Sequence, residues 1–158
     1  MIFISHNKKD EYRALEIKTY LDKYNIESYI DVLDPQIKIT EDITQHIISK
    51  LRNSTHLIVV FTENTKDSMW VPFELGAAYE SGKGIGVFLK NQFVKLPEYL
   101  DAFPLMKDYL GLNEYIKLYQ RQTVSIQKSI TESIGFEKTS SQKQEFAGKF
   151  IKDLKSLL

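Results

Sequence analysis

The sequence lacks cysteine and a net charge. None of its 158 residues is cysteine, and 21 lysine and arginine residues balance 21 aspartate and glutamate residues. Without cysteine there can be no disulfide, no thiolate metal ligand and no cysteine nucleophile. A formal net charge of zero gives no long-range field that would attract a phosphodiester backbone, so we expect no nucleic acid partner.

Long hydrophobic runs are also missing. The longest apolar runs have about five residues, whereas a helix that spans a bilayer needs roughly twenty. Only three apolar residues, Ile2 to Ile4, follow Met1 before the chain turns polar. That is too few for the apolar region of a signal peptide. We therefore expect a cytoplasmic protein without a membrane partner.

Short apolar runs alternate with longer amphipathic stretches, a pattern typical of parallel strands joined by crossover helices. The expected strands cover residues 2–4, 28–30, 56–61 and 85–89, with a fifth edge strand within 104–108. The sequence predicts an α/β fold, a flavodoxin-like parallel sheet of about five strands with helices on both faces. This domain is expected over residues 1–135, and a C-terminal helical extension over residues 136–158.

Capping residues predict where the helices begin. Asp10 is expected to cap the first crossover helix and Thr40 the second, because their side-chain oxygens can accept free N–H groups of a first turn. The third helix is expected over residues 69–81 and the fourth over 113–134. Ser141 with Gln144 has the spacing of a capping box for the last helix, which we expect to pack on the domain or on a partner.

A doubly wound parallel sheet binds its ligands beyond the carboxyl ends of the strands, where the strand order reverses. The segments that follow the predicted strands there are residues 5–9, 31–39 and 62–74. The glycine-rich run at residues 82–86 precedes a strand and does not follow one, so it does not fit a dinucleotide-binding loop. The histidines at positions 6, 46 and 56 lack carboxylates at metal-ligand spacing, and we expect no metal.

Glu74 is the most informative acidic residue. It lies four residues after Trp70 and three before Ala77, so in a continuous helix it shares a face with apolar neighbours. One interpretation is a partly desolvated carboxylate that holds ribose hydroxyls and stabilises positive charge on a sugar. The other is that Pro72 occupies the first helical position, which makes Glu74 an ordinary third-position residue favoured by the helix dipole. The residues alone leave both open.

Four segments occur in the order and approximate spacing of a Toll/interleukin-1 receptor (TIR) domain. They are Ile2–His6, Tyr29–Val32, Leu57–Thr62 and Trp70–Glu74. The chain resembles this family over about residues 1–130, and in particular its NAD⁺-cleaving members from bacterial antiphage defence. The order of the four motifs is specific, whereas Trp-x-x-x-Glu alone would be weak.

The resemblance implies roles for individual residues. Glu74 corresponds to the catalytic glutamate, and Trp70 is its neighbour in the pocket. The substrate site would further be lined by residues after the first two strands, namely Ser5, His6, Asn7, Asp31 and Lys38. NAD⁺ is implied as the substrate, with no cofactor.

The sequence departs from the family pattern in two places. Where many relatives have glycine in the loop after the second strand, this chain has residues 36–39 with the sequence Gln-Ile-Lys-Ile, which should stiffen the loop. Where the animal NADase has arginine after the first strand, this chain has His6 and Asn7. Contacts to the phosphates would then come from Lys8, Lys9 or Lys38.

The implied activity is that of an NAD⁺ glycohydrolase or cyclase, which releases nicotinamide and forms ADP-ribose or a cyclic derivative used as a signal. The implied partners are further copies of the chain, which associate through TIR surfaces, and a separate effector protein that responds to the product. A non-catalytic TIR adaptor is the main alternative, because a retained glutamate does not guarantee activity. A nucleoside deoxyribosyltransferase-like enzyme is the third.

Overall fold

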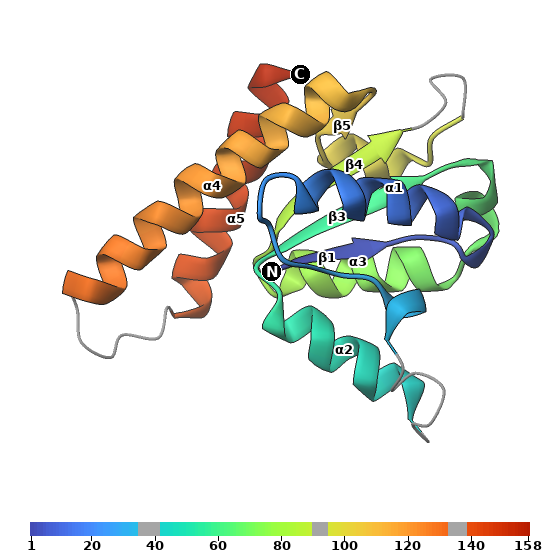
Figure 1. Cartoon of the computed structure of the whole chain (residues 1–158), viewed down its shortest axis with the longest axis horizontal. Helices are drawn as coiled ribbons and strands as arrows, with labels where there is room; N and C mark the ends of the chain where they lie inside the picture. The colour runs from blue at the N-terminus through green and yellow to red at the C-terminus, as the bar shows by residue number, and fades with distance from the viewer. Residues whose placement is uncertain (35–41, 90–94, 133–138) are drawn as a thin grey trace.

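The computed structural model describes residues 1–34, 42–89, 95–132 and 139–158 (Figure 1). A five-stranded sheet has the order β2-β1-β3-β4-β5, and every neighbouring pair is parallel. The strands are β1 (Ile2–Ser5), β2 (Ser28–Tyr29), β3 (His56–Phe61), β4 (Gly84–Leu89) and β5 (Leu105–Met106). This confirms the predicted flavodoxin-like sheet, including the short edge strand.

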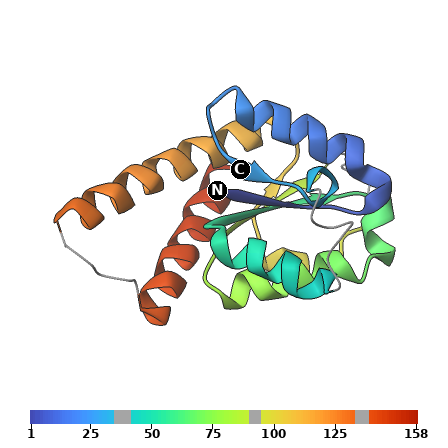
Figure 2. The ribbon, with the colours of Figure 1, turned by 60° about the horizontal axis from the view of Figure 1, so that its bottom comes forward.

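Helices cover both faces of this sheet, as Figure 2 shows. They are α1 (Glu11–Asp22), α2 (Ile43–Asn53), α3 (Trp70–Glu80), α4 (Tyr109–Glu132) and α5 (Ser140–Leu157). One hydrophobic layer joins the sheet to α1, α4 and α5, and the other joins it mainly to α2 and α3. None of the helices in the described ranges has the length and apolar character needed to cross a membrane.

The central strand β3 is buried along its whole length. Alternate side chains enter opposite layers, so Ile58 and Val60 pack with α1 and α4 while Leu57 and Val59 pack with α2 and α3. A parallel strand covered on both faces needs a continuous apolar sequence. The run of β-branched residues in β3 therefore has a direct structural cause.

Helix α5 packs on the sheet through an aromatic cluster around His56, the first residue of β3. The buried imidazole ring contacts Tyr119 of α4 and Phe150 of α5, at centroid distances of 4.8 and 4.7 Å. Its Nε2 atom lies 3.1 Å from Oε1 of Gln122. Burial lowers the pKa of His56 to about 3, so the ring stays neutral. The expected packing of the last helix on the domain is confirmed, while the division at residue 135 stays a prediction.

The starts of α2, α4 and α5 differ from the predicted ones. Helix α2 begins at Ile43, and the carboxylate of Asp42 caps it by accepting the N–H of Gln45 at 2.9 Å. Asp42 lies directly before the helix and has a non-helical backbone, as a capping residue requires. Thr40, the predicted cap, lies outside the described residues. Helix α4 begins at Tyr109, four residues before the predicted start, because the Asp108 carboxylate accepts the N–H of Gly111 at 2.9 Å.

The capping box of α5 is formed by Thr139 and Gln142, two residues before the predicted pair. The predicted partner Gln144 instead donates its side-chain amide to the carbonyl of Glu80, at the end of α3. Both residue pairs have the spacing of a capping box. The contact between α5 and α3 therefore decides which pair caps the helix.

Replacing Gly84 by alanine should destabilise the fold. A Cβ atom there would lie 2.3 Å from Cδ2 of His56 and 3.1 Å from Cδ1 of Phe150. Both rings are buried, so the cost should be about 1–3 kcal/mol of unfolding free energy. Gly148→Ala is the matched control, because a Cβ atom on that helical glycine has no neighbour within 4 Å. Urea unfolding should show a loss only for Gly84→Ala, and equal stabilities would contradict the packing around His56.

Candidate functional site

The strand order reverses at β1, because the chain passes from β1 to β2 on one side and then returns to β3 on the other. Ser5 ends β1, the 3₁₀ helix η2 (Asp31–Leu33) follows β2, and Thr62 follows β3. These segments share the carboxyl edge of the sheet, where ligands bind in such folds. The described parts of the three segments singled out from the sequence therefore meet at one edge.

Glu74 lies inside helix α3, with only 6% of its surface exposed. It belongs to the buried stripe of α3 together with Val71, Leu75 and Ala78. Because α3 begins at Trp70, Glu74 is the fifth helical residue and Pro72 is the third. The interpretation of Glu74 as a third-position residue after an initial proline is therefore wrong.

The carboxylate of Glu74 accepts a hydrogen bond from the buried hydroxyl of Ser5, with an Oγ to Oε2 distance of 2.5 Å. The pKa of Glu74 is raised to about 8: burial raises it most, the negative charge of Asp31 also raises it, and the Ser5 hydrogen bond lowers it. Desolvation has the largest effect because the charged form loses its water. The free site thus holds a largely protonated carboxyl group at neutral pH.

His6 and Asp31 form the second pair of the site. Nε2 of His6 lies 3.6 Å from Oδ1 of Asp31, and the His6 side chain is 4% exposed. The same carboxylate accepts the N–H of Val32 at 2.8 Å. Four of the predicted site residues, namely Ser5, His6, Asp31 and Glu74, are therefore brought together from three separate segments.

Asn7 has a structural role in the same loop. Its amide nitrogen donates to the carbonyl of Asn64 at 2.9 Å, and its oxygen accepts the N–H of Lys9 at 2.9 Å. Asn7 thereby connects the loop after β1 to the 3₁₀ helix η4 (Glu63–Asp67) after β3. Its proposed contact with substrate stays a prediction.

A buried carboxylate at Asp10 was missed as part of this edge. The sequence predicts that Asp10 caps α1, but its side chain makes no capping bond. It accepts hydrogen bonds from Oγ1 of Thr62 at 2.6 Å and from Nδ2 of Asn64 at 3.0 Å. The sequence offered a signal for this role of Asp10. Thr62 and Asn64 follow a buried strand closely, and buried polar side chains need hydrogen-bond partners.

Trp70, the first residue of α3, lies at the surface, and its place in a substrate pocket stays a prediction. Its side chain is 43% exposed and meets the 45% exposed ring of Phe73 edge to face, at 5.8 Å between centroids. Met69, at 86% exposed, extends this apolar surface. Lys8 and Lys9 are exposed on the 3₁₀ helix η1 (Lys8–Asp10) that follows β1, whereas Lys38 lies outside the described residues.

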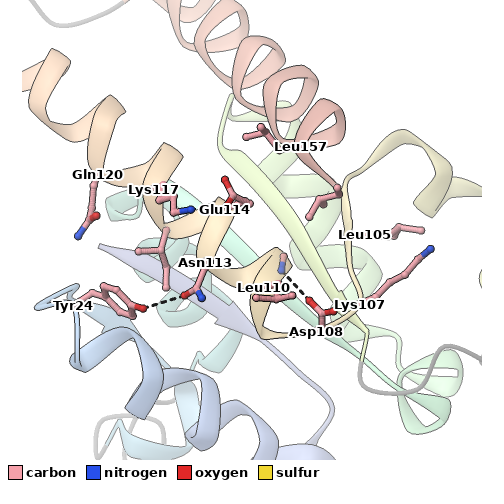
Figure 3. A pocket seen from close by; sticks show the side chains of 13 residues that line it. Tyr24, Leu105, Lys107, Asp108, Leu110, Asn113, Glu114, Lys117, Gln120 and Leu157 are labelled. Atoms are coloured by element: carbon pink, nitrogen blue, oxygen red, sulfur yellow. Dashed lines mark hydrogen bonds and ion pairs between the residues drawn. The ribbon is translucent and has the colours of Figure 1, made fainter.

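A groove of about 770 Å³ lies between the start of α4, the end of α5 and Tyr24 (Figure 3). Leu110, Lys117 and Leu157 are among its lining residues, and Asn113 there accepts a hydrogen bond from the hydroxyl of Tyr24 at 3.0 Å. The groove contains none of the predicted site residues. It is therefore separate from the carboxylate site.

Comparison with known proteins supports the same fold. Residues 2–128 match the model of a protein family described as the TIR domain. A relative from Bacillus cereus (strain MSX-D12), named "Probable 3' cyclic ADP-D-ribose synthase ThsB'", is 28% identical over 123 residues, which cover 73% of this chain and 59% of the relative. The chain thus spans about three fifths of that relative's length.

A solved structure gives an independent comparison of the fold. The TIR domain of the Toll-related receptor TRR-2 from Hydra magnipapillata superimposes with a TM-score of 0.60 at 15% identity. The alignment covers 80% of this chain and 97% of that domain. At this identity the likeness concerns the fold alone.

Replacing Glu74 by glutamine should stabilise the protein at high pH. The carboxyl group has an ordinary pKa of 4.5 and a folded-state pKa of about 8, so folding favours its protonated form. The stability that this group contributes is present below the lower value and is lost as the pH rises through the upper one. The amide of glutamine does not titrate. Thermal unfolding should give similar melting temperatures at about pH 5 and a higher one for Glu74→Gln at about pH 9.

The control is Glu98→Gln, which neutralises an exposed carboxylate in the 3₁₀ helix η5 (Glu98–Ala102). It should not show a gain that grows with pH. If Glu74→Gln and wild type keep the same pH dependence of melting temperature, Glu74 is not desolvated as described.

Proposed function

This chain belongs to the TIR domain family, and we propose that it breaks the bond between nicotinamide and ribose in NAD⁺, with Glu74 as the catalytic carboxylate. The observation that carries the proposal is the burial of Glu74 on α3, where Ser5 donates to it and Asp31 lies nearby. A buried acid with a strongly shifted pKa at a ligand-binding edge favours a catalytic role over a purely structural one. The name of the Bacillus cereus relative, which describes a synthase of a cyclic ADP-ribose, is consistent with this chemistry.

One carboxylate is sufficient for this reaction. Nicotinamide leaves NAD⁺ as a neutral molecule, because the electron pair of the breaking C–N bond neutralises the pyridinium. Its departure therefore needs no proton donor, unlike the cleavage of a bond between two sugars. Positive charge develops on the ribose, and a carboxylate in a water-poor site stabilises that charge more strongly than it would in water.

The raised pKa of Glu74 fits a cationic substrate. In the free protein, burial favours the protonated carboxyl group. Binding of the positively charged nicotinamide ring beside it would favour the ionised form, because an opposite charge nearby lowers the pKa of an acid. Water then completes the reaction to ADP-ribose with release of a proton, whereas attack by another atom of the same ADP-ribosyl group gives a cyclic product.

We further propose a cytoplasmic role in bacterial antiphage defence. The product would act as a signal for a separate effector protein, as the family resemblance implies.

A non-catalytic adaptor remains the second candidate, and one observation favours it. Met69, Trp70 and Phe73 form an exposed apolar surface at the start of α3. Exposed apolar surfaces of this kind often mark protein interaction sites. The same surface would also serve self-association of an active enzyme, so activity must separate the two candidates.

Glu74→Gln should abolish most of the activity and retain binding. The change keeps the size of the side chain but removes the charge that stabilises the ribosyl cation, which typically costs about two to three powers of ten in turnover. NAD⁺ affinity should fall far less than turnover, because the charge acts more strongly on the ribosyl cation than on the bound ground state. Nicotinamide release and calorimetric titration with NAD⁺ measure the two quantities.

Glu98→Gln again serves as the control and should keep the wild-type rate. Wild-type turnover in Glu74→Gln would refute the catalytic assignment. A wild-type protein that cleaves no NAD⁺ at any tested concentration, while still self-associating, would favour the adaptor.

We also propose that the active form is a dimer or larger oligomer. Phe73→Ser should then weaken association and lower specific activity in parallel, because it removes apolar area from the exposed surface of α3. Val124→Ser is the control, since Val124 is 52% exposed on α4. Light scattering and specific activity over a dilution series measure both effects. Specific activity that stays constant down to concentrations where only monomer is present would contradict the proposal.

A further inference from the structure

A further buried carboxylate, that of Asp34, lies next to the site without being part of it. Asp34 directly follows η2, and its side chain is only 7% exposed. Nε2 of His46 lies 2.8 Å from its Oδ2 atom, and Nζ of Lys50 lies 3.4 Å from the same atom. His46 and Lys50 are four residues apart on α2, so they share one face of that helix. Asp34 thus attaches the end of η2 to α2.

Tyr29 of β2 completes this cluster. Nζ of Lys50 lies 5.3 Å from the centroid of its ring. Burial raises the pKa of the Tyr29 phenol, and the carboxylates of Asp34, Asp31 and Glu74 raise it further. The phenol therefore stays neutral and lies close to three acidic side chains. Tyr29 therefore lies between the Asp34 cluster, which consists of Asp34, His46 and Lys50, and the Glu74 site.

The connection from Asp34 back to Asp31 is a single short turn. The N–H of Asp34 donates to the carbonyl of Asp31 at 2.9 Å, and the Asp31 carboxylate accepts the N–H of Val32 at 2.8 Å. Such a turn leaves little freedom between its two ends. Anchoring Asp34 on α2 consequently limits where the Asp31 side chain can lie.

Asp31 needs such a constraint. Its side chain is 42% exposed, and its Oδ1 atom lies 3.6 Å from Nε2 of the His6 imidazole. Like charges disfavour each other when they are close, so the ionised forms of Asp31 and Glu74 repel. A half-exposed carboxylate on a free turn would move toward solvent to relieve this repulsion.

We propose that Asp34 is a positioning residue for the site, which through its contacts with His46 and Lys50 fixes η2 so that Asp31 stays beside His6 and Glu74. Its catalytic consequence rests on the proposed function, because Asp31 acts on the residue assigned as the catalytic carboxylate. The structural part of the proposal concerns only the placement of Asp31. The two parts can therefore be tested separately.

The pKa of Glu74 depends on the position of Asp31 and can therefore be used to detect a movement of Asp31. Among the described residues, Ser5 from the end of β1, Tyr29 from β2 and Asp31 from η2 interact with this carboxylate. His6 pairs with Asp31, and Asp34 with its α2 partners His46 and Lys50 interacts with Tyr29. Asp31 raises the pKa of Glu74. If Asp31 moves away, the Glu74 pKa should fall, which a merely stabilising role for Asp34 would not cause.

The experiment is a carbon-13 NMR titration of the Glu74 carboxyl group in glutamate-labelled protein, with its resonance assigned by its loss in Glu74→Gln. Asp31→Asn and Asp34→Asn should each lower the Glu74 pKa, on the order of one pH unit for one displaced charge. The Glu74 pKa of the double variant should be no lower than that of Asp31→Asn alone, because both changes act through Asp31. Asp22→Asn, which neutralises an exposed carboxylate paired with Lys18, should leave the value unchanged.

Lys50→Met separates anchoring from direct charge. It keeps the Asp34 carboxylate but removes one of its anchors, whose side chain is 36% exposed. Loss of anchoring should lower the Glu74 pKa, whereas loss of a nearby positive charge by itself would raise it. A raised value in Lys50→Met, or additive falls in Asp31→Asn and Asp34→Asn, would overturn the proposal. The first result means that the direct effect of the Lys50 charge outweighs anchoring, and the second means that Asp34 acts through its own charge.

The titration does not depend on enzymatic activity. If wild type cleaves no NAD⁺ but the Glu74 pKa responds as expected, the proposed function fails and the positioning role of Asp34 stands. If wild type is active, the pH profile of kcat/KM in Asp34→Asn should shift to lower pH together with the NMR value. An unshifted profile alongside an unshifted NMR value would reject the positioning role alone.

Discussion

The burial of β3 on both faces is the constraint on which the rest of the structure depends. Its six side chains are all buried, so helices must cover both sides of the sheet. Parallel strands can satisfy this demand only through crossover connections, which bring the ends of all strands to one edge. Ser5, Asp31 and Thr62 meet there for this reason, although they are far apart in the sequence.

Glu74 is an exception to the apolar packing that this burial requires. The rest of its stripe on α3 is apolar, and a charged carboxylate in such a place loses hydration that one hydroxyl group from Ser5 only partly replaces. A leucine at this position would stabilise the same helix better. An acid that weakens packing at a ligand-binding edge is better explained by chemistry than by folding, which is the physical support for the proposed role.

The sequence predicted the strands well because their patterns are local. A continuous apolar run identifies β3 without any knowledge of its neighbours. The start of α3 could not be predicted in this way. Pro72 is compatible with the first or the third helical position, since N–H groups of the first turn have no partner within the helix. Only packing against the sheet places the start at Trp70 and so buries Glu74.

Asp31 and Glu74 were predicted from the sequence as site residues, but the third carboxylate near Tyr29, Asp34, was not, because α2 and η2 become neighbours only in the folded chain. Each of the three carboxylates is compensated differently. Asp34 has His46 and Lys50, and Asp31 has His6 and a backbone N–H group. Within the described residues, the hydrogen bond to Glu74 comes from the neutral hydroxyl of Ser5. When acidic groups crowd together, the one with the weakest compensation holds the proton. The arrangement therefore makes Glu74 the residue whose charge depends most on what binds beside it.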